Sequence, residues 1–156
     1  PVDDLESMYD KYGNILFRLC LVILSNESDA EDAIQETFLR YIKKKPIFNG
    51  PEHEKAWFIK VASNVCKDMR RFKFTHKEFN LEELTHYHSD MKHGNILEQV
   101  LALPPKYKIV IHLYYVEGYK VDEIARLISL SPSAIKMRLL RGRELLKIEL
   151  KEEYNL

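Results

Sequence analysis

Helix-breaking residues are scarce in this chain, and their scarcity narrows the folds open to it. Only 5 glycines and 6 prolines occur among 156 residues. Apolar residues recur near every 3.6 positions, and few runs alternate as a half-buried strand requires. Because 46% of the residues are apolar, a packed core is expected. The sequence therefore predicts an all-α protein.

Breaks in this periodicity divide the chain into two blocks. In the first block we expect helices over about 5–24, 28–45 and 54–72, the second opened by a capping box of Ser28 and Glu31. In the second block we expect helices over about 96–103, 107–117 and 121–128, and a last one from Pro132 capped by Ser131. The intervening segment has mixed charges and scattered apolar residues, apart from a short helix expected at 81–84. The predicted architecture is two small helical domains, residues 1–74 and 95–156, joined by a flexible linker, 75–94.

Cysteine usage and hydropathy indicate a cytoplasmic protein. Cys20 and Cys66 lie in apolar helical patterns without CxxC spacing, so we expect reduced, buried thiols. The longest uninterrupted apolar run is the six residues 19–24, whereas crossing a bilayer takes roughly 20. No direct membrane insertion is expected.

Charge is balanced overall but segregated along the chain. The 24 basic and 24 acidic residues cancel, which is unusual for a bulk polyanion binder. An acidic block occupies 29–36, whereas basic blocks occupy 67–73 and 136–147. Separate acidic and basic faces predict two kinds of partner.

The last two predicted helices have the helix-turn-helix pattern. A short helix with a small residue, a three-residue turn at 129–131 and a longer helix follow one another. At about 100° per residue, the inner face of the long helix holds Ile135, Leu139, Gly142 and Leu146. Its outer face holds Lys136, Met137, Leu140, Arg141, Glu144 and Lys147. In a major groove such cations meet phosphates and guanine edges, and an apolar tip meets a thymine methyl. The alternative is an αα-hairpin with a solvated face.

Two faces of the first block also suggest binding. The outer side of helix 54–72 collects cations and two neutral hydrogen-bonding side chains: Lys60, Ser63, Asn64, Lys67, Arg70 and Arg71. Cations suit phosphates, and Phe48 and Asn49 in the preceding loop could stack on and hydrogen-bond to an unpaired base.

On helix 28–45, Asp32, Gln35, Glu36 and Leu39 share the outer side. A leucine among carboxylates is typical of a protein-docking site. Both faces could also be ordinary solvated surface.

Three stretches in order resemble the extracytoplasmic-function (ECF) sigma factors of bacterial RNA polymerase. Residues 29–40, DAEDAIQETFLR, look like the polymerase-docking helix of that family, and 56–64, AWFIKVASN, together with Asp68, look like its promoter-melting helix. Leu103-Pro104-Pro105, the YYVEG and EIA segments, and IKMRLLRGR at 135–143 look like its C-terminal domain. The sequence departs from the family at Ser129, where glycine is usual, and at Lys120, where Ser or Thr is frequent.

The resemblance implies a protein that binds core RNA polymerase and directs promoter-specific transcription initiation. Such factors are not enzymes, need no cofactor or metal, and are commonly held inactive by an anti-sigma factor. The polymerase-binding residues would be Asp32, Gln35, Glu36 and Leu39. The minus-ten DNA contacts would be Phe48, Asn49, Lys60, Ser63, Asn64, Lys67, Arg70 and Arg71, with the 47–51 loop holding a flipped base. The minus-thirty-five contacts would be Ser133, Lys136, Met137, Arg138, Leu140, Arg141 and Arg143.

Three rival interpretations remain open from the sequence. A metal-dependent enzyme would use His86, His88, Asp90 and His93, but no second ligand cluster or phosphate-binding loop accompanies them. A stand-alone helix-turn-helix regulator would explain the C-terminal block but not the acidic face. A pure interaction module would leave both basic faces without a purpose.

Overall fold

The computed structural model describes residues 2–72 and 99–154, and nearly all of them are helical. They contain no strand, and they divide into two compact units, one within residues 1–80 and one within 81–156. The all-α prediction is confirmed. The predicted linker, the short helix expected at 81–84 and the four candidate metal ligands lie outside the described residues.

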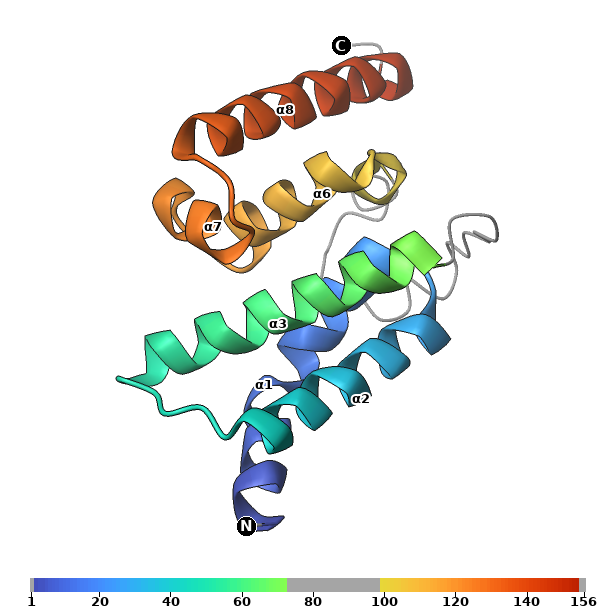
Figure 1. Cartoon of the computed structure of the whole chain (residues 1–156). Helices are drawn as coiled ribbons and strands as arrows, with labels where there is room; N and C mark the ends of the chain where they lie inside the picture. The colour runs from blue at the N-terminus through green and yellow to red at the C-terminus, as the bar shows by residue number, and fades with distance from the viewer. Residues whose placement is uncertain (1, 73–98, 155–156) are drawn as a thin grey trace. The chain divides into compact units, whose positions relative to one another are not determined.

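The N-terminal unit is a bundle of three helices, α1 (Val2–Leu24), α2 (Glu27–Lys44) and α3 (Pro51–Phe72). Each helix packs on the other two (Figure 1). Leu16 and Leu19 of α1 and Ala30 of α2 are almost fully buried. Phe58 of α3 is also fully buried and is the centre of an aromatic cluster, with ring centroids 4.9–5.4 Å away from Tyr12, Phe38, Tyr41 and Trp57.

The two cysteines lie in this core. Cys20 of α1 and Cys66 of α3 are free thiols and are fully buried, as predicted. A hydrogen bond with Cys20 and burial raise the pKa of the Cys66 thiol well above its ordinary value. Because the thiolate is the reactive form of cysteine, Cys66 is expected to be chemically inert in the folded state.

Helix α2 begins earlier than the sequence pattern suggested. Asn26, and not Ser28, is the N-cap, and its side-chain oxygen accepts a hydrogen bond from the N–H of Asp29 at 2.8 Å. Ser25 adopts a left-handed conformation with φ 56°, which ends α1 and leaves Asn26 extended. The predicted capping box at Ser28 is therefore wrong, because the chain turns two residues before it.

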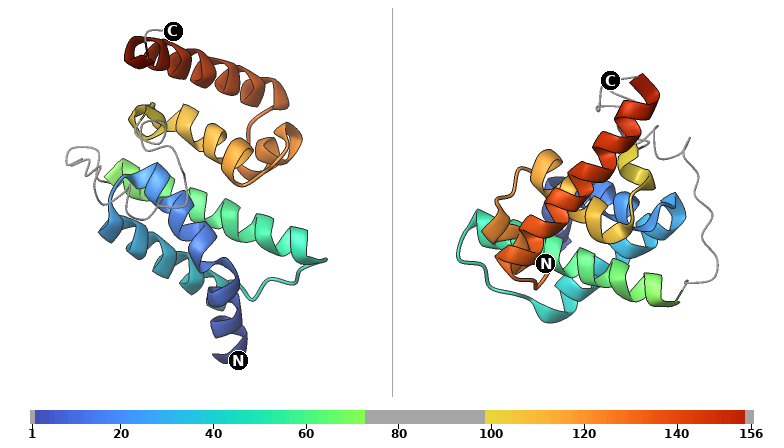
Figure 2. Two further views of the ribbon diagram at one scale, coloured as in Figure 1. Left: turned by 180° about the vertical axis from the view of Figure 1, so that it is seen from behind. Right: turned by 90° about the horizontal axis from the view of Figure 1, so that it is seen from above.

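The C-terminal unit contains α6 (Pro105–Ile111), the π-helix η1 (His112–Val116), α7 (Val121–Leu127) and α8 (Pro132–Tyr154). Figure 2 shows α8 running along α6.

The single helix expected over 107–117 is instead an α-helix that widens into a π-helical turn. Nε2 of His112 lies 3.3 Å from Oε1 of Glu117, and both side chains are nearly fully buried. Gly118, with φ 74°, ends the π-helix.

The helix-turn-helix pattern is confirmed in α7 and α8. Ser129 adopts φ 57°, the left-handed conformation for which glycine is the usual residue. Ser131 caps α8, because its Oγ accepts the N–H of Ala134 at 3.1 Å. Lys120 has no acceptor on its side chain, so the Glu123 carboxylate caps α7 by accepting the N–H of Lys120 at 3.0 Å. The Glu123 carboxylate thus compensates for the missing Ser or Thr.

Candidate docking and nucleic-acid surfaces

The acidic face of α2 is exposed as the sequence indicated. Asp32 and Gln35 are exposed. Leu39 is 48% exposed, and the side chain of Glu36 is 46% exposed. The opposite side of α2 is buried through Ala30, Ala33, Ile34, Thr37 and Phe38. A fixed helix therefore presents two carboxylates, an amide and a leucine on one surface.

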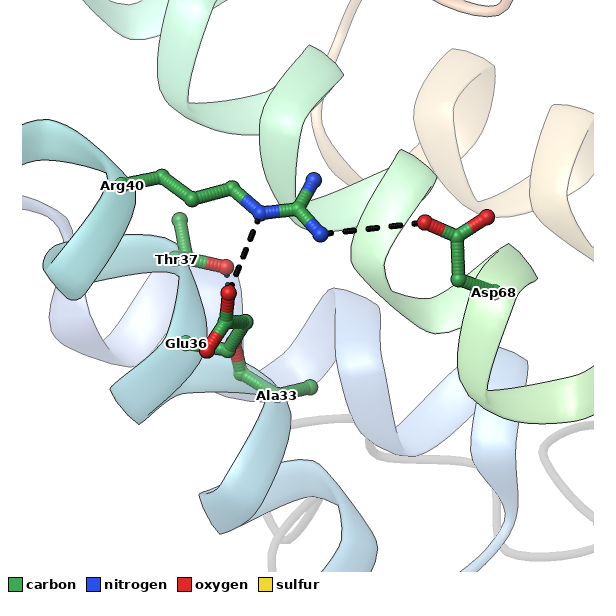
Figure 3. A network of polar contacts seen from close by, with 5 residues as sticks. All are labelled: Ala33, Glu36, Thr37, Arg40 and Asp68. Atoms are coloured by element: carbon green, nitrogen blue, oxygen red, sulfur yellow. Dashed lines mark hydrogen bonds and ion pairs between the residues drawn. The ribbon is translucent and has the colours of Figure 1, made fainter. Parts of the chain in front are cut away.

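Arg40 joins this face to helix α3. Its Nε lies 3.3 Å from Oε1 of Glu36, and its Nη2 lies 3.7 Å from Oδ2 of Asp68 (Figure 3). Below it, Thr37 donates its hydroxyl proton to the carbonyl of Ala33 at 2.7 Å. The guanidinium thus links the candidate docking helix to the helix that carries the basic stripe.

A groove of about 720 Å³ lies beside the acidic face, a feature that the sequence did not reveal. It runs between α1 and α2, and it is lined by Leu5, Glu6, Tyr9, Phe17, Glu31, Ile34, Gln35, Phe38, Leu39 and Ile42. Tyr9 and Ile42 are 55% and 45% exposed, respectively. Single exposed apolar residues gave little sequence signal, because the groove exists only once α1 and α2 pack together. The candidate docking surface is therefore part acidic and part apolar.

The basic stripe of α3 is largely exposed. Lys60, Asn64, Lys67 and Arg71 are exposed and follow one side of the helix. Ser63 and Arg70 are only partly exposed and lie at its edge. Burial lowers the pKa of the Arg70 guanidinium, although the Cys66 thiol works in the opposite direction. The fully exposed part of the basic stripe is therefore narrower than the six residues that the sequence pattern grouped together.

The loop before α3 packs the Phe48 ring against the aromatic side chains of α3. The Phe48 ring lies edge-on to His53 at 5.5 Å and to Trp57 at 5.9 Å between centroids. It is half-buried, whereas the neighbouring Ile47 is 89% exposed and Asn49 is exposed. In this arrangement the Phe48 ring packs edge-on against His53 and Trp57 while part of it stays exposed, and its role as a minus-ten contact stays a prediction.

The outer face of α8 is largely exposed, as the sequence pattern indicated. Met137 and Leu140 are 63% and 48% exposed, and Arg138 is half-buried. The other predicted minus-thirty-five contacts are exposed: Ser133, Lys136, Arg141 and Arg143. Nη1 of Arg141 lies 3.3 Å from Oε2 of Glu144.

Arg143 is held by aromatic rings and so differs from the other cations of α8. Its guanidinium lies 5.9 Å and 5.8 Å from the ring centroids of Tyr114 and Tyr115. Cation–π contacts of this kind restrain the side chain. Arg143 therefore has a more restrained side chain than a freely solvated arginine would have.

Each of the two units matches a known protein family. Residues 8–73 match the family model for sigma-70 region 2, and residues 93–146 match that for sigma-70 region 4. The ECF RNA polymerase sigma factor SigW of Bacillus subtilis is 27% identical, with 96% of this chain and 90% of SigW covered. The RNA polymerase sigma factor SigV of the same organism is 28% identical, with 88% and 85% covered. The chain is an ECF sigma factor.

Two solved structures share the fold of this sigma factor. The sigma factor RpoE of Bartonella quintana, solved with the anti-sigma factor NepR, superposes with a TM-score of 0.72 at 17% identity, over 95% of this chain and 97% of RpoE. CnrH, solved with the cytosolic domain of CnrY, also superposes with a TM-score of 0.72, at 21% identity, over 97% of this chain and 90% of CnrH.

Two further features of the sigma factor concern membranes and metals. No helix in residues 2–72 and 99–154 is both long and apolar enough to cross a membrane. Over those same residues, no three His, Cys, Asp or Glu side chains are grouped to hold a metal ion.

Proposed function

We propose that this sigma factor binds core RNA polymerase through the α2 face formed by Asp32, Gln35, Glu36 and Leu39. Charge and an adjoining apolar groove support this assignment, since interfaces combine an apolar centre with a polar rim. The groove enlarges the surface beyond the single exposed leucine on α2. The sigma factor would act in the cytoplasm, where its polymerase works, and it would carry out no catalytic step itself.

Promoter reading is divided between the two units in this proposal. Lys60, Asn64 and Lys67 on α3 would contact the minus-ten strand once it has unpaired, with Arg71 continuing the stripe. The α8 face of Lys136, Met137, Leu140 and Arg141 would lie in the minus-thirty-five major groove, which fits a helix. The division into residues 1–74, a linker at 75–94 and residues 95–156 remains part of the proposal.

An anti-sigma factor is the proposed negative regulator. The two solved neighbours are both complexes, one with an anti-sigma factor and one with the cytosolic domain of CnrY. An inhibitor that covered the α1–α2 groove would also cover Leu39 and Gln35. Inhibitor and polymerase would then exclude one another at this surface.

The single observation that carries the proposal is the ordered match of both units to sigma-70 regions 2 and 4. A stand-alone helix-turn-helix regulator would account for residues 93–146 alone.

The discriminating experiment asks whether specific promoter binding requires core polymerase. It uses core enzyme of Bacillus subtilis and a pool of templates with randomised minus-ten and minus-thirty-five segments, followed by mapping of transcription start sites. The best template from this pool is called the selected promoter below.

A further inference from the structure

His53, in the first turn of α3, has an imidazole ring that is held on one side by a hydrogen bond, and its other ring nitrogen has no role in the sites described above. The backbone N–H of Asn49 donates a hydrogen bond to Nδ1 of His53 at 3.0 Å. Because Nδ1 acts as an acceptor, the neutral ring carries its proton on Nε2. The His53 side chain is exposed, so this Nε2–H is available to a ligand.

The loop between α2 and α3, residues 45–50, which is hydrogen-bonded to His53, is itself anchored at both ends. Its start is set by Lys45, whose N–H donates to the carbonyl of Tyr41 at 3.0 Å. Its end is set by Gly50, whose carbonyl accepts the N–H of Glu54 at 3.1 Å. The Phe48 ring lies 5.5 Å from the His53 ring, at an interplanar angle of 82°. The imidazole therefore has a defined orientation before any ligand arrives.

His53 also continues the basic stripe of α3. At about 100° per residue, His53, Lys60, Asn64 and Lys67 fall within an arc of about 60°. All four side chains are exposed. From His53 to Lys67 the helix rises about 21 Å, at 1.5 Å per residue, which is the length of about six stacked nucleotides at 3.4 Å each. The stripe thus gains a neutral donor at the end next to the loop.

We propose that His53 is a minus-ten DNA contact, with its Nε2–H donating to an acceptor atom on an unpaired base. This inference rests on the proposed promoter-opening function of α3. A neutral donor in a fixed orientation distinguishes bases by their edges, whereas the lysines of the stripe attract any phosphate. His53 would therefore contribute to sequence preference as well as to affinity.

Two substitutions separate this role from anchoring of the loop. His53→Asn keeps an acceptor near the position of Nδ1, so it can still hold the Asn49 N–H, but it loses the outward donor. His53→Gln reaches further and restores a donor near the position of Nε2 while weakening the loop anchor. Glu52→Gln, at the exposed neighbouring position, is the matched control.

The test measures binding of a fluorescent single-stranded minus-ten oligonucleotide by each variant assembled with core polymerase. Each base of the oligonucleotide is replaced in turn by an abasic site. Losing one hydrogen bond to a base edge is expected to weaken binding by His53→Asn about tenfold. At one position the abasic site should weaken wild type, His53→Gln and Glu52→Gln, but should leave His53→Asn unchanged.

The outcomes separate this inference from the proposed function. If the wild-type complex binds no minus-ten oligonucleotide, the proposed function of α3 fails, and the inference fails with it. If the wild type binds and His53→Asn has the same abasic profile, only the inference is overturned. His53→Ser, which also lacks the outward donor, replaces His53→Asn in the scan if thermal melting shows that the Asn variant is unfolded.

Discussion

Gly142 of α8 lies directly against Ile111, the last residue of α6. A Cβ atom on Gly142 would come within 3.1 Å of Cγ1 and 3.2 Å of Cδ1 of Ile111. Because Ile111 is 4% exposed, it has little room to move aside. This close approach brings α8 onto α6, and it explains why a residue of low helix propensity occupies the middle of a long helix.

The first prediction concerns this contact. Gly142→Val should destabilise the C-terminal unit by about 2–3 kcal/mol, because overpacking a filled core outweighs the gain in helix propensity. The measurement is urea unfolding followed by circular dichroism. Trp57 is the only tryptophan and lies in the N-terminal unit, so its fluorescence transition should stay unchanged. Glu144→Val, at an exposed position on the same helix, is the control. Equal destabilisation by the two substitutions would contradict the packing argument.

The second prediction concerns the acidic face of α2. The double variant Asp32→Lys, Glu36→Lys should lose association with core polymerase in a pull-down. Glu36→Lys removes a surface contact with Arg40 and places a second cation beside it, and because such surface effects are small, the free energy of unfolding should fall by less than about 1 kcal/mol. Asp4→Lys, Asp10→Lys makes the same charge change on exposed residues of α1 and should retain binding. Undiminished binding by the folded α2 variant would rule out this docking surface.

The third prediction separates the two DNA-contacting helices. Asn64→Ala should spare closed-complex formation at the selected promoter and slow opening, because in the proposed function Asn64 contacts the strand that unpairs. Arg141→Ala should weaken recruitment, since losing a base-edge contact typically costs about 1–3 kcal/mol. A pre-melted minus-ten bubble should rescue Asn64→Ala more than Arg141→Ala in run-off transcription. Arg126→Ala, on the exposed side of α7, is the control. If the bubble rescues both variants equally, the division of roles is wrong.

The fourth prediction concerns pH and Glu54 at the start of α3. Its Oε1 accepts hydrogen bonds from the hydroxyl of Tyr12 at 2.6 Å and from Nζ of Lys11 at 2.9 Å. Burial raises the pKa of this carboxyl, but the bonds from Tyr12 and Lys11 outweigh burial, and the net pKa is lowered. A lowered folded-state pKa contributes stability above the unfolded value of about 4.3, and this stability is lost as pH falls through the folded-state pKa.

Urea unfolding monitored by Trp57 fluorescence tests this contribution. Wild type should be more stable than Glu54→Gln at pH 7, and the difference should shrink as the pH is lowered from 5 to 3. Glu52→Gln, at an exposed position on the same turn, should show no such pH dependence. A wild-type advantage that is constant over this range would contradict the link between Glu54, Tyr12 and Lys11.

Local features were the part of the structure that the sequence predicted well. Helical periodicity placed Ile135, Leu139 and Gly142 on the buried side of α8, where the structure has them. The N-cap at Ser131 also followed from residue type, whereas the left-handed conformation of Ser129 is where the resembled family has glycine. The cap at Ser131 depends on interactions within a few residues of chain, whereas the buried side of α8 is visible in the sequence because apolar periodicity marks the face that packs on other helices.

Features that depend on packing between helices were missed. The groove between α1 and α2 forms only when two helices meet, so neither Tyr9 nor Ile42 signalled it alone. The contacts of the Phe48 ring with Trp57 and His53 likewise depend on how the loop packs on α3 and could not be predicted from the sequence. The π-helix at 112–116 is a single widened turn, too short to disturb the periodicity. The site residues themselves remain predictions that only binding experiments test.

Core-dependent initiation is the most direct test of the whole account. The purified sigma factor, core polymerase and the selected promoter are combined in a run-off transcription assay, and a footprint of the sigma factor alone is measured at physiological salt. A net charge of zero gives the free protein little long-range attraction to duplex DNA. We predict a discrete transcript only when both proteins are present, and no specific footprint from the sigma factor alone. A tight, specific footprint without core, accompanied by no transcript when core is added, would contradict the account.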